Sequence, residues 1–260
     1  MSSREERKRE ARARRKRDAE LRARARRKRR LVGIGATAVT AVVLAGAIAI
    51  AVAEGGRTRP PSAGLPARDV RPASILGTLG SPGSPGRLGP EGVPVPQAPN
   101  LAGAGTAESV SITDGIQCVG AEQLLFHIHA HLTVFVNGRA RRIPYGVGVR
   151  GAQVTATPAG PFAAGGSCFY WLHTHAADGI IHIESPIART FTLGDFFDVW
   201  RQKLGPDEVG PSTGPVTSLV DGYVYRGNPR DIPLAAHAQI QLEVGRQLVA
   251  PVAITFAAGL

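Results

Sequence analysis

The chain has 260 residues, of which 31 are lysine or arginine and 20 are aspartate or glutamate, so its formal net charge is +11. All of this excess lies in residues 1–30, which hold 16 basic and 5 acidic side chains. The other 230 residues carry 15 charges of each sign. The high isoelectric point therefore describes a basic tail and excludes a strongly charged folded domain.

Residues 31–53 follow the tail as a run of 23 residues without a charged side chain. A helix of about 20 apolar residues crosses the hydrocarbon core of a bilayer, and a lysine- and arginine-rich flank stays on the cytoplasmic side. The sequence predicts a single transmembrane helix with the N-terminus inside the cell. The alternative is a signal peptide cleaved within residues 51–53, although its apolar region usually has only about 7–15 residues.

The basic tail could also be interpreted as a nucleic-acid-binding arm. It contains no aromatic side chain that could stack on bases. Positive charge beside a membrane span already has a topological role, and anionic lipid on the inner surface attracts it. We therefore expect the membrane, and not nucleic acid, as the partner of this segment.

Residues 54–106 have the composition of a linker, because 10 of these 53 residues are proline and 11 are glycine. Such a stretch buries too little apolar surface to order itself. We predict a disordered linker that holds a folded domain, residues 107–260, away from the membrane. That length is sufficient for one sizeable core.

The predicted domain consists mainly of strands. Alternating or continuous apolar patterns predict strands over residues 129–136, 216–220, 234–244 and 252–256. The first two run into Asn137-Gly138 and Asp221-Gly222, and such dipeptides favour two-residue hairpin turns because both turn positions need positive φ.

One helix is predicted over residues 193–204. Thr192 can cap it, with Asp195 as the acidic partner of a capping box, and Gly205-Pro206 should end it. Its apolar residues recur on one face, which should pack on the strands. We expect an all-β, sandwich-like domain with one packed α-helix.

The two cysteines each precede a segment that contains histidines. Cys118 lies nine residues before His127, and Cys168 lies five before His173. Oxidation is favoured outside the cytoplasm, and a Cys118–Cys168 disulfide would hold the two segments side by side. Metal-bound thiolates are the alternative, but these cysteines lack the C-x-x-C spacing of structural zinc sites.

Six of the seven histidines lie within residues 127–182, mostly on alternating positions. Side chains alternate between the two faces of a strand, so these segments place imidazoles opposite an apolar face. Imidazole is the commonest protein ligand for transition metals, and two rings at i and i+2 can lean onto one ion. We predict a metal site formed by His127, His129, His131, His173, His175 and His182.

We expect His129 and His131 to face His173 and His175, with His182 nearby. His237 is the seventh histidine and the expected outlier, because its strand lies far along the chain. Six histidines exceed one tetrahedral site, which leaves open two ions or bystander rings.

Asp178 and Glu184 could complete a mixed site or orient the ligating rings. Binding by imidazoles suits zinc, copper(II), nickel or iron, and copper or zinc is our first expectation. The predicted domain contains no methionine, which argues against a copper(I) site with a thioether ligand.

Four segments within residues 110–245 together resemble a group of uncharacterised membrane-anchored extracytoplasmic domains of bacteria and archaea. They are HIHAHLTVFVNG, YWLHTHAADGIIHIESP, TFTLGDFFDVW and GNPRDIPLAAHAQIQLEVG. This resemblance implies a single domain and no particular chemistry.

The segment WLHTHAADGIIHIES is also similar to copper-binding segments of multicopper oxidases, which implies a cupredoxin-like sandwich. Neither cysteine has the histidine neighbours of a blue-copper site, so we expect no oxidase.

No nucleophile motif and no phosphate-binding glycine loop is present. The first hypothesis for function is therefore a non-catalytic module that captures, buffers or senses a transition metal ion outside the membrane. The second is a metal-free interaction domain with a protein partner. The third is a metal-dependent enzyme with an open coordination position.

Overall fold

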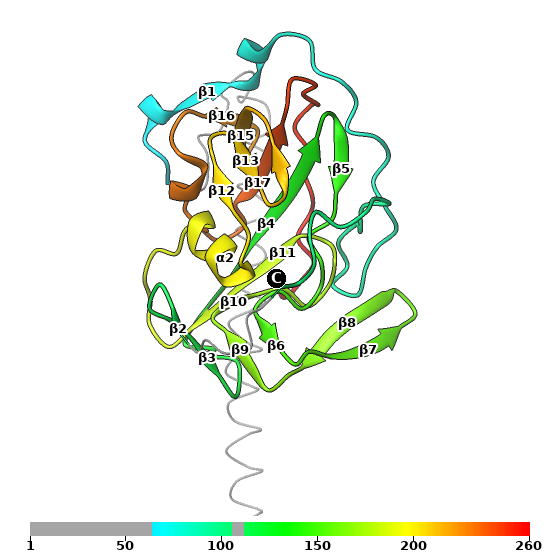
Figure 1. Ribbon diagram of the computed structural model, residues 1–260, viewed down its shortest axis with the longest axis vertical. Helices are drawn as coiled ribbons and strands as arrows, with labels where there is room; N and C mark the ends of the chain where they lie inside the picture. Colours follow the sequence, from blue (N-terminus) through cyan, green and yellow to red (C-terminus); the bar gives the residue numbers. More distant parts are fainter. Residues whose placement is uncertain (1–63, 106–111) are drawn as a thin grey trace, which may run out of the picture. The chain divides into compact units, whose positions relative to one another are not determined.

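The computed structural model describes residues 64–105 and 112–260, which belong to one unit spanning residues 60–260 (Figure 1). The predicted basic tail (1–30) and transmembrane helix (31–53) lie outside the described residues. No helix within the described ranges is long and apolar enough to cross a membrane.

The largest element is a mixed sheet of eight strands, with the order β1-β16-β15-β17-β4-β11-β10 and with β5 paired to β4. Its strands are β1 (Val70–Pro72), β4 (Phe126–Val136), β5 (Arg139–Arg141), β10 (Leu172–His173), β11 (Ile180–Ser185), β15 (Val216–Val220), β16 (Tyr223–Tyr225) and β17 (Gln239–Val244). Strands β4 and β17 run parallel, and the other pairs are antiparallel. The long strand β4 therefore links the two halves of the sheet (Figure 1).

Three smaller sheets complete the β structure. A four-stranded sheet has the order β2 (Ile112–Thr113), β3 (Ile116–Val119), β9 (Cys168–Tyr170) and β6 (Val149–Arg150). A hairpin joins β7 (Gln153–Thr157) to β8 (Gly160–Gly165), and β12 (Leu204–Gly205), β13 (Glu208–Val209) and β14 (Ser212–Thr213) form the last sheet. Short 3-10 turns occupy η1 (Ala67–Asp69), η2 (Ala73–Leu76) and η3 (Pro229–Asp231). The described part is thus mostly β-sheet with one α-helix, as expected for an all-β sandwich.

Helix α2 (Leu193–Trp200) has the predicted capping box. The Thr192 hydroxyl accepts a hydrogen bond from the backbone N–H of Asp195, whose carboxylate accepts one from the N–H of Thr192. The helix ends earlier than predicted, because Arg201 adopts the left-handed conformation with φ 61°. The residues expected to form its last turn instead lead into β12.

The apolar faces of the predicted segments meet in one core. Alternate residues of β4 and β11 join the buried side of α2 there, among them Ala130, Leu132, Val134, Ile181, Ile183, Phe196, Phe197 and Trp200. The opposite face of β4 and β11 is left for the histidines. The predicted Cys118–Cys168 disulfide is present and joins β3 to β9.

Both predicted hairpin turns are confirmed. Asn137 and Gly138 have φ of 48° and 71°, and Asp221 and Gly222 have φ of 51° and 81°. In each case the two positive φ angles connect antiparallel neighbours, β4 with β5 and β15 with β16.

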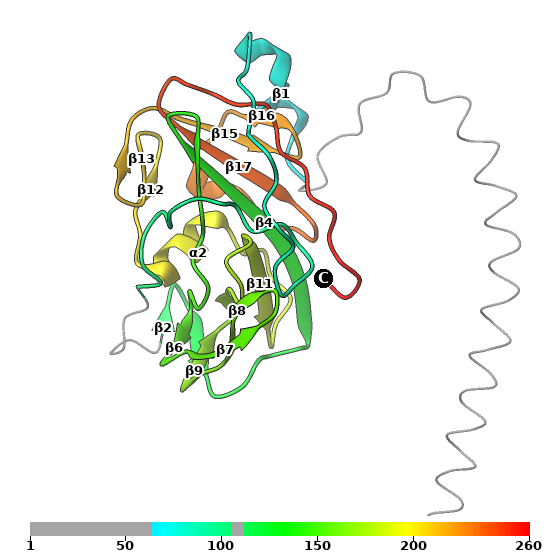
Figure 2. The same cartoon turned by 90° about the vertical axis from the view of Figure 1, so that its right-hand side faces the viewer.

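The other two strand predictions need correction. Strand β17 starts at Gln239 and not at residue 234, because the chain turns at His237, where φ is 61° and Ala238 donates back to Ala235. Residues 252–256 form no strand. Their backbone is held by side chains of β17, since Gln241 accepts from the N–H of Val252 at 2.8 Å and Gln239 accepts from that of Ile254 at 2.7 Å. Figure 2 shows this C-terminal segment, in red, running beside β17.

The predicted linker also differs from what its composition indicates. Its described part, residues 64–105, contributes β1 to the large sheet and packs on the domain. Val93 is fully buried, and the backbone of Leu101 donates to Arg142. Residues 64–105 have little regular structure but are held in place by contacts with the rest of the domain. Amino-acid composition alone does not predict such contacts.

Candidate metal centre

The register of three strands brings the histidines together. Strand β11 pairs with β4 so that His182 lies opposite His129 and Glu184 lies opposite His127. Strand β10 pairs with β11 so that His173 lies opposite His182. Paired residues on neighbouring strands point to the same face of a sheet. One face of β4, β11 and β10 therefore carries a cluster of imidazoles with a carboxylate among them.

On the β4 side, four ligand atoms follow one another around a closed ring. His127 Nε2 lies 3.1 Å from His129 Nε2, which lies 3.1 Å from His182 Nδ1. Glu184 Oε1 closes the ring at 3.3 Å from His182 Nδ1 and 3.2 Å from His127 Nε2.

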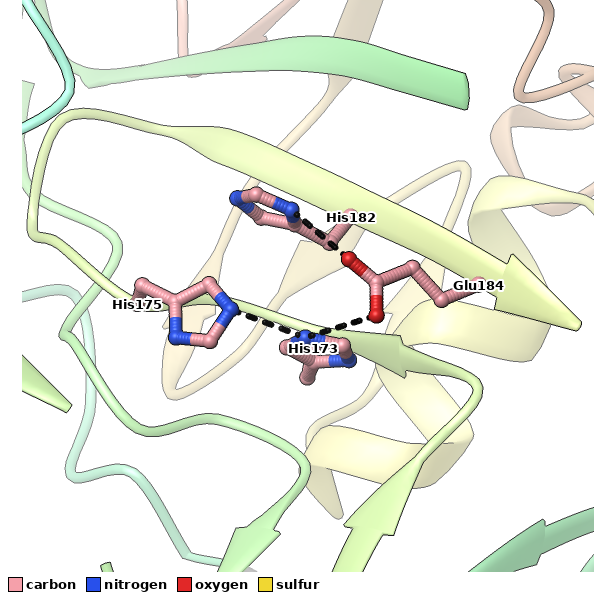
Figure 3. Close-up of side chains that lie close together, drawn as sticks. All are labelled: His173, His175, His182 and Glu184. Carbon is pink, nitrogen blue, oxygen red and sulfur yellow. Dashed lines mark hydrogen bonds and ion pairs between the residues drawn. The ribbon is translucent and has the colours of Figure 1, made fainter. Parts of the chain in front are cut away.

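On the β10 side, His173 and His175 form a second pair, with their Nε2 atoms 3.1 Å apart. The other oxygen of Glu184, Oε2, lies 4.0 Å from His173 Nε2. Figure 3 shows Glu184 beside His182 and His173, with one oxygen directed to each of these rings, while His175 lies across from it and contacts His173. Glu122 approaches from outside, with Oε1 3.3 Å from His175 Nε2.

Hydrogen bonds fix which nitrogen each of three rings presents. His173 Nδ1 donates to the carbonyl of Tyr170 at 2.9 Å, and His175 Nδ1 donates to that of Ala163 at 2.7 Å. Since a carbonyl only accepts, Nε2 is left with a free lone pair in both rings. His182 Nε2 likewise meets a carboxylate, Glu91 Oε1, at 2.6 Å. Metal-binding histidines typically make such bonds with the nitrogen that does not ligate.

Burial keeps the rings of His129 and His173 neutral, and only a neutral imidazole can bind a metal ion. Burial, together with the neighbouring His182 and His127, lowers the pKa of His129 to about 3. Burial also holds the pKa of His173, which is fully buried, well below its usual range. His182 differs: burial lowers its pKa, but hydrogen bonds to Glu184 and Glu91 outweigh that effect and raise it to about 9.

The carboxylate of Glu184 has one oxygen that no hydrogen bond satisfies. Its side chain is 3% exposed, and its Oε2 atom is buried without a hydrogen-bond partner in the described part of the chain. A buried charge is costly unless it is paired or coordinates a metal. A cation bound between Glu184 and the imidazoles would supply this pairing, so the residues present fit a metal ion.

Glu91 contacts the histidine cluster, and the sequence did not reveal it. It lies in the segment predicted to be a linker, and its Oε2 accepts from the backbone N–H of Ala176 at 3.1 Å. Glu122, just before β4, was likewise not predicted. Neither has a sequence signal, because only the packing of these segments brings them to the histidines.

His131 does not join the cluster, contrary to its predicted place opposite His173 and His175. Its Nε2 donates to the carbonyl of Asp178 at 2.9 Å, and its Nδ1 lies 3.4 Å from the Thr133 hydroxyl. Burial lowers its pKa to about 4. His131 pairs across the strands with Ile180 rather than with a histidine, so the pair on β4 is His127 with His129.

His237 and Asp178 also stand apart from the ligand atoms. His237 is exposed, lies 2.9 Å from the carbonyl of Leu260 and stacks on Phe256, which confirms it as the outlier. Asp178 is buried and accepts from the N–H of Ile180. Burial and the charge of Glu91 raise its pKa to about 7.

Two groups of side chains can each hold an ion, with all their ligand atoms within 4.8 Å of one another. One group is His173, His175, His182 and Glu184, and the other is His127, His129 and His182. Comparison of the chain with family models, with curated proteins and with solved structures finds no match. The chemistry of the centre is therefore inferred from its own residues.

Proposed function

We propose that this protein binds a transition metal ion through His127 and His129 of β4 and through His173 and His175 at the end of β10, and that it captures, buffers or senses that ion. The observation that carries this proposal is the buried group of His173, His175, His182 and Glu184, whose ligand atoms converge within 4.8 Å. In a histidine with a purely structural role in the core, both ring nitrogens would have hydrogen-bond partners, as those of His131 do. The free lone pairs of His173 Nε2 and His175 Nε2 instead point at one another, 3.1 Å apart.

The distances within the cluster match those around a metal ion. Zinc–nitrogen bonds are about 2.0–2.1 Å long, which places neighbouring ligand atoms about 2.8–3.4 Å apart in square or tetrahedral geometry. Within each histidine pair, the two Nε2 atoms are 3.1 Å apart. Imidazoles with one carboxylate suit zinc and copper(II). The likeness to copper-binding segments makes copper the ion to test first.

We also propose that the domain lies outside the cytoplasm, anchored by the predicted helix of residues 31–53. The basic residues 1–30 support an inside N-terminus, and the disulfide is of the kind that persists in oxidising compartments. The resemblance to membrane-anchored extracytoplasmic domains supports the same placement. Protease added to intact cells should digest the domain and spare the tail, and a protected domain would contradict this topology.

Metal uptake by the full-length protein in detergent tests the function. We would equilibrate the protein with copper(II) or zinc, remove free ions by dialysis and determine the bound metal by elemental analysis. The wild type and the control His237→Ala, whose ring lies away from the cluster, should retain metal. The double variant His129→Ala/His173→Ala, which removes one ring from each pair, should retain none. A folded wild type that takes up no metal would refute the proposal.

A further inference from the structure

We propose that the centre holds two metal ions, one at each histidine pair, and that the carboxylate of Glu184 bridges them. This inference rests on the metal binding proposed above and extends it to a binuclear site. Glu184 would bind one ion through Oε1 and the other through Oε2.

One ion cannot serve both pairs. Ligand atoms on opposite sides of a single ion lie at most about 4.2 Å apart when each bond is about 2.1 Å long. The two pairs fall in separate groups of mutually close ligand atoms, His127 with His129 in one and His173 with His175 in the other. The four rings therefore do not converge on one point, and each pair needs an ion of its own.

The first ion has three imidazole ligands, because the ligand atoms of His127, His129 and His182 all lie within 4.8 Å of one another. Glu184 is not within that distance of all three, and it would reach the ion from the side of His127 and His182. The closed ring of His127 Nε2, His129 Nε2, His182 Nδ1 and Glu184 Oε1 has successive separations of 3.1, 3.1, 3.3 and 3.2 Å. Each falls in the range of about 2.8–3.4 Å expected between neighbouring ligands. Glu91 accepts the proton of His182 Nε2, which leaves Nδ1 as the ligating nitrogen.

The second ion has the more buried set of ligands. His173 Nε2 and His175 Nε2 are fixed by the bonds of their Nδ1 atoms to backbone carbonyls. Glu184 Oε2 supplies the third ligand atom. Glu122 can supply a fourth, since its Oε1 lies 3.3 Å from His175 Nε2, but its side chain is 37% exposed.

Glu184 is placed to act as the bridge. Its Oε1 faces His127 and His182, while its Oε2 faces His173. The same Oε2 is the buried atom without a hydrogen-bond partner in the described ranges. A single ion in the first ring would leave this oxygen unpaired, whereas a second ion satisfies it.

The number of ions and their magnetic interaction test the bridge. Titration of the full-length protein with copper(II), followed by elemental analysis, should give two ions per chain. His127→Ala/His129→Ala and His173→Ala/His175→Ala should each bind one, and His237→Ala should still bind two. Two copper(II) ions joined by one carboxylate should show coupled electron spins, and either double variant should show the spectrum of an isolated ion.

The outcomes separate the inference from the function on which it rests. One ion per chain in the wild type would overturn the bridge and leave metal binding standing. Two ions with uncoupled spins would also overturn it. No bound metal would refute both. The spin measurement on the wild type does not depend on whether the variants fold.

Discussion

Glu91 Oε1 lies 2.6 Å from His182 Nε2, although 91 residues separate them in the chain. The segment that carries Glu91 has no strand of its own at this point, yet it places a buried carboxylate against the one histidine common to both ligand groups. The proline- and glycine-rich segment is therefore part of the histidine cluster proposed to bind metal.

Replacement of Glu91 should weaken metal binding without removing a ligand. In Glu91→Ala the His182 ring loses the acceptor that fixes its orientation and proton, and loss of such a partner typically costs about 10–100-fold in metal affinity. We expect a fall of that size in a titration competing with a chelator, with the number of bound ions unchanged. Glu208→Ala, which removes a surface partner of Lys203, is the matched control. Equal affinities for the two variants would show that Glu91 has no such role.

His131 distinguishes the observed cluster from the one predicted. Both of its ring nitrogens already have protein partners, so His131→Ala should leave the metal content unchanged. It should lower the free energy of unfolding by about 1–3 kcal/mol, because the carbonyl of Asp178 loses a buried donor. Metal analysis and urea denaturation of the same sample would test this, and loss of an ion would restore His131 to the ligand set.

Local features of the fold were predictable from the sequence. Asn137-Gly138 and the capping box of Thr192 and Asp195 act over a few residues, and the structure contains both. The alternation of histidine with apolar residues likewise gave the correct faces of β4 and β11. Each of these depends on backbone geometry that neighbouring residues impose.

Long-range features were not predictable in the same way. His131 and His129 have the same pattern along β4, and only the register with β11 places His129 opposite His182 and His131 opposite Ile180. The start of β17 depends on the turn at His237, which lets the strand run parallel to β4. Glu91 depends on a segment whose composition indicates disorder. The positions of the β4 histidines, the start of β17 and the contact of Glu91 all depend on pairing between segments that are far apart in the sequence.

Glu243 should make the stability of the metal-free protein depend on pH. It is buried on β17, Gln241 donates to its Oε1, and its Oε2 has no hydrogen-bond partner among the described residues. Burial raises its pKa from 4.5 to about 7. The folded protein therefore binds this proton more tightly than the unfolded chain, and stability falls as pH rises from about 4.5 to about 7.

We expect Glu243 to contribute about 2–3 kcal/mol to this loss. Urea denaturation across that pH range should show a flatter dependence for Glu243→Gln, whose side chain stays neutral. An unchanged slope in the variant would assign the pH dependence to other groups.

The disulfide should contribute strongly to stability. Cys118 and Cys168 are 50 residues apart, and closing a loop of that length is worth about 4 kcal/mol in the chain-entropy description. Cys118→Ser/Cys168→Ser should lose roughly that amount in guanidinium denaturation. A double variant as stable as the wild type would show that packing alone holds β3 against β9.

The most direct test of the metal centre is anomalous X-ray diffraction from crystals of the full-length protein loaded with copper or zinc. Data collected on either side of the absorption edge of the metal should give two peaks, one on each side of the Glu184 carboxylate. Each should lie about 2 Å from the Nε2 atoms of one histidine pair. The absence of anomalous density among these residues in metal-soaked crystals, or density only at His237, would contradict a metal centre at this site.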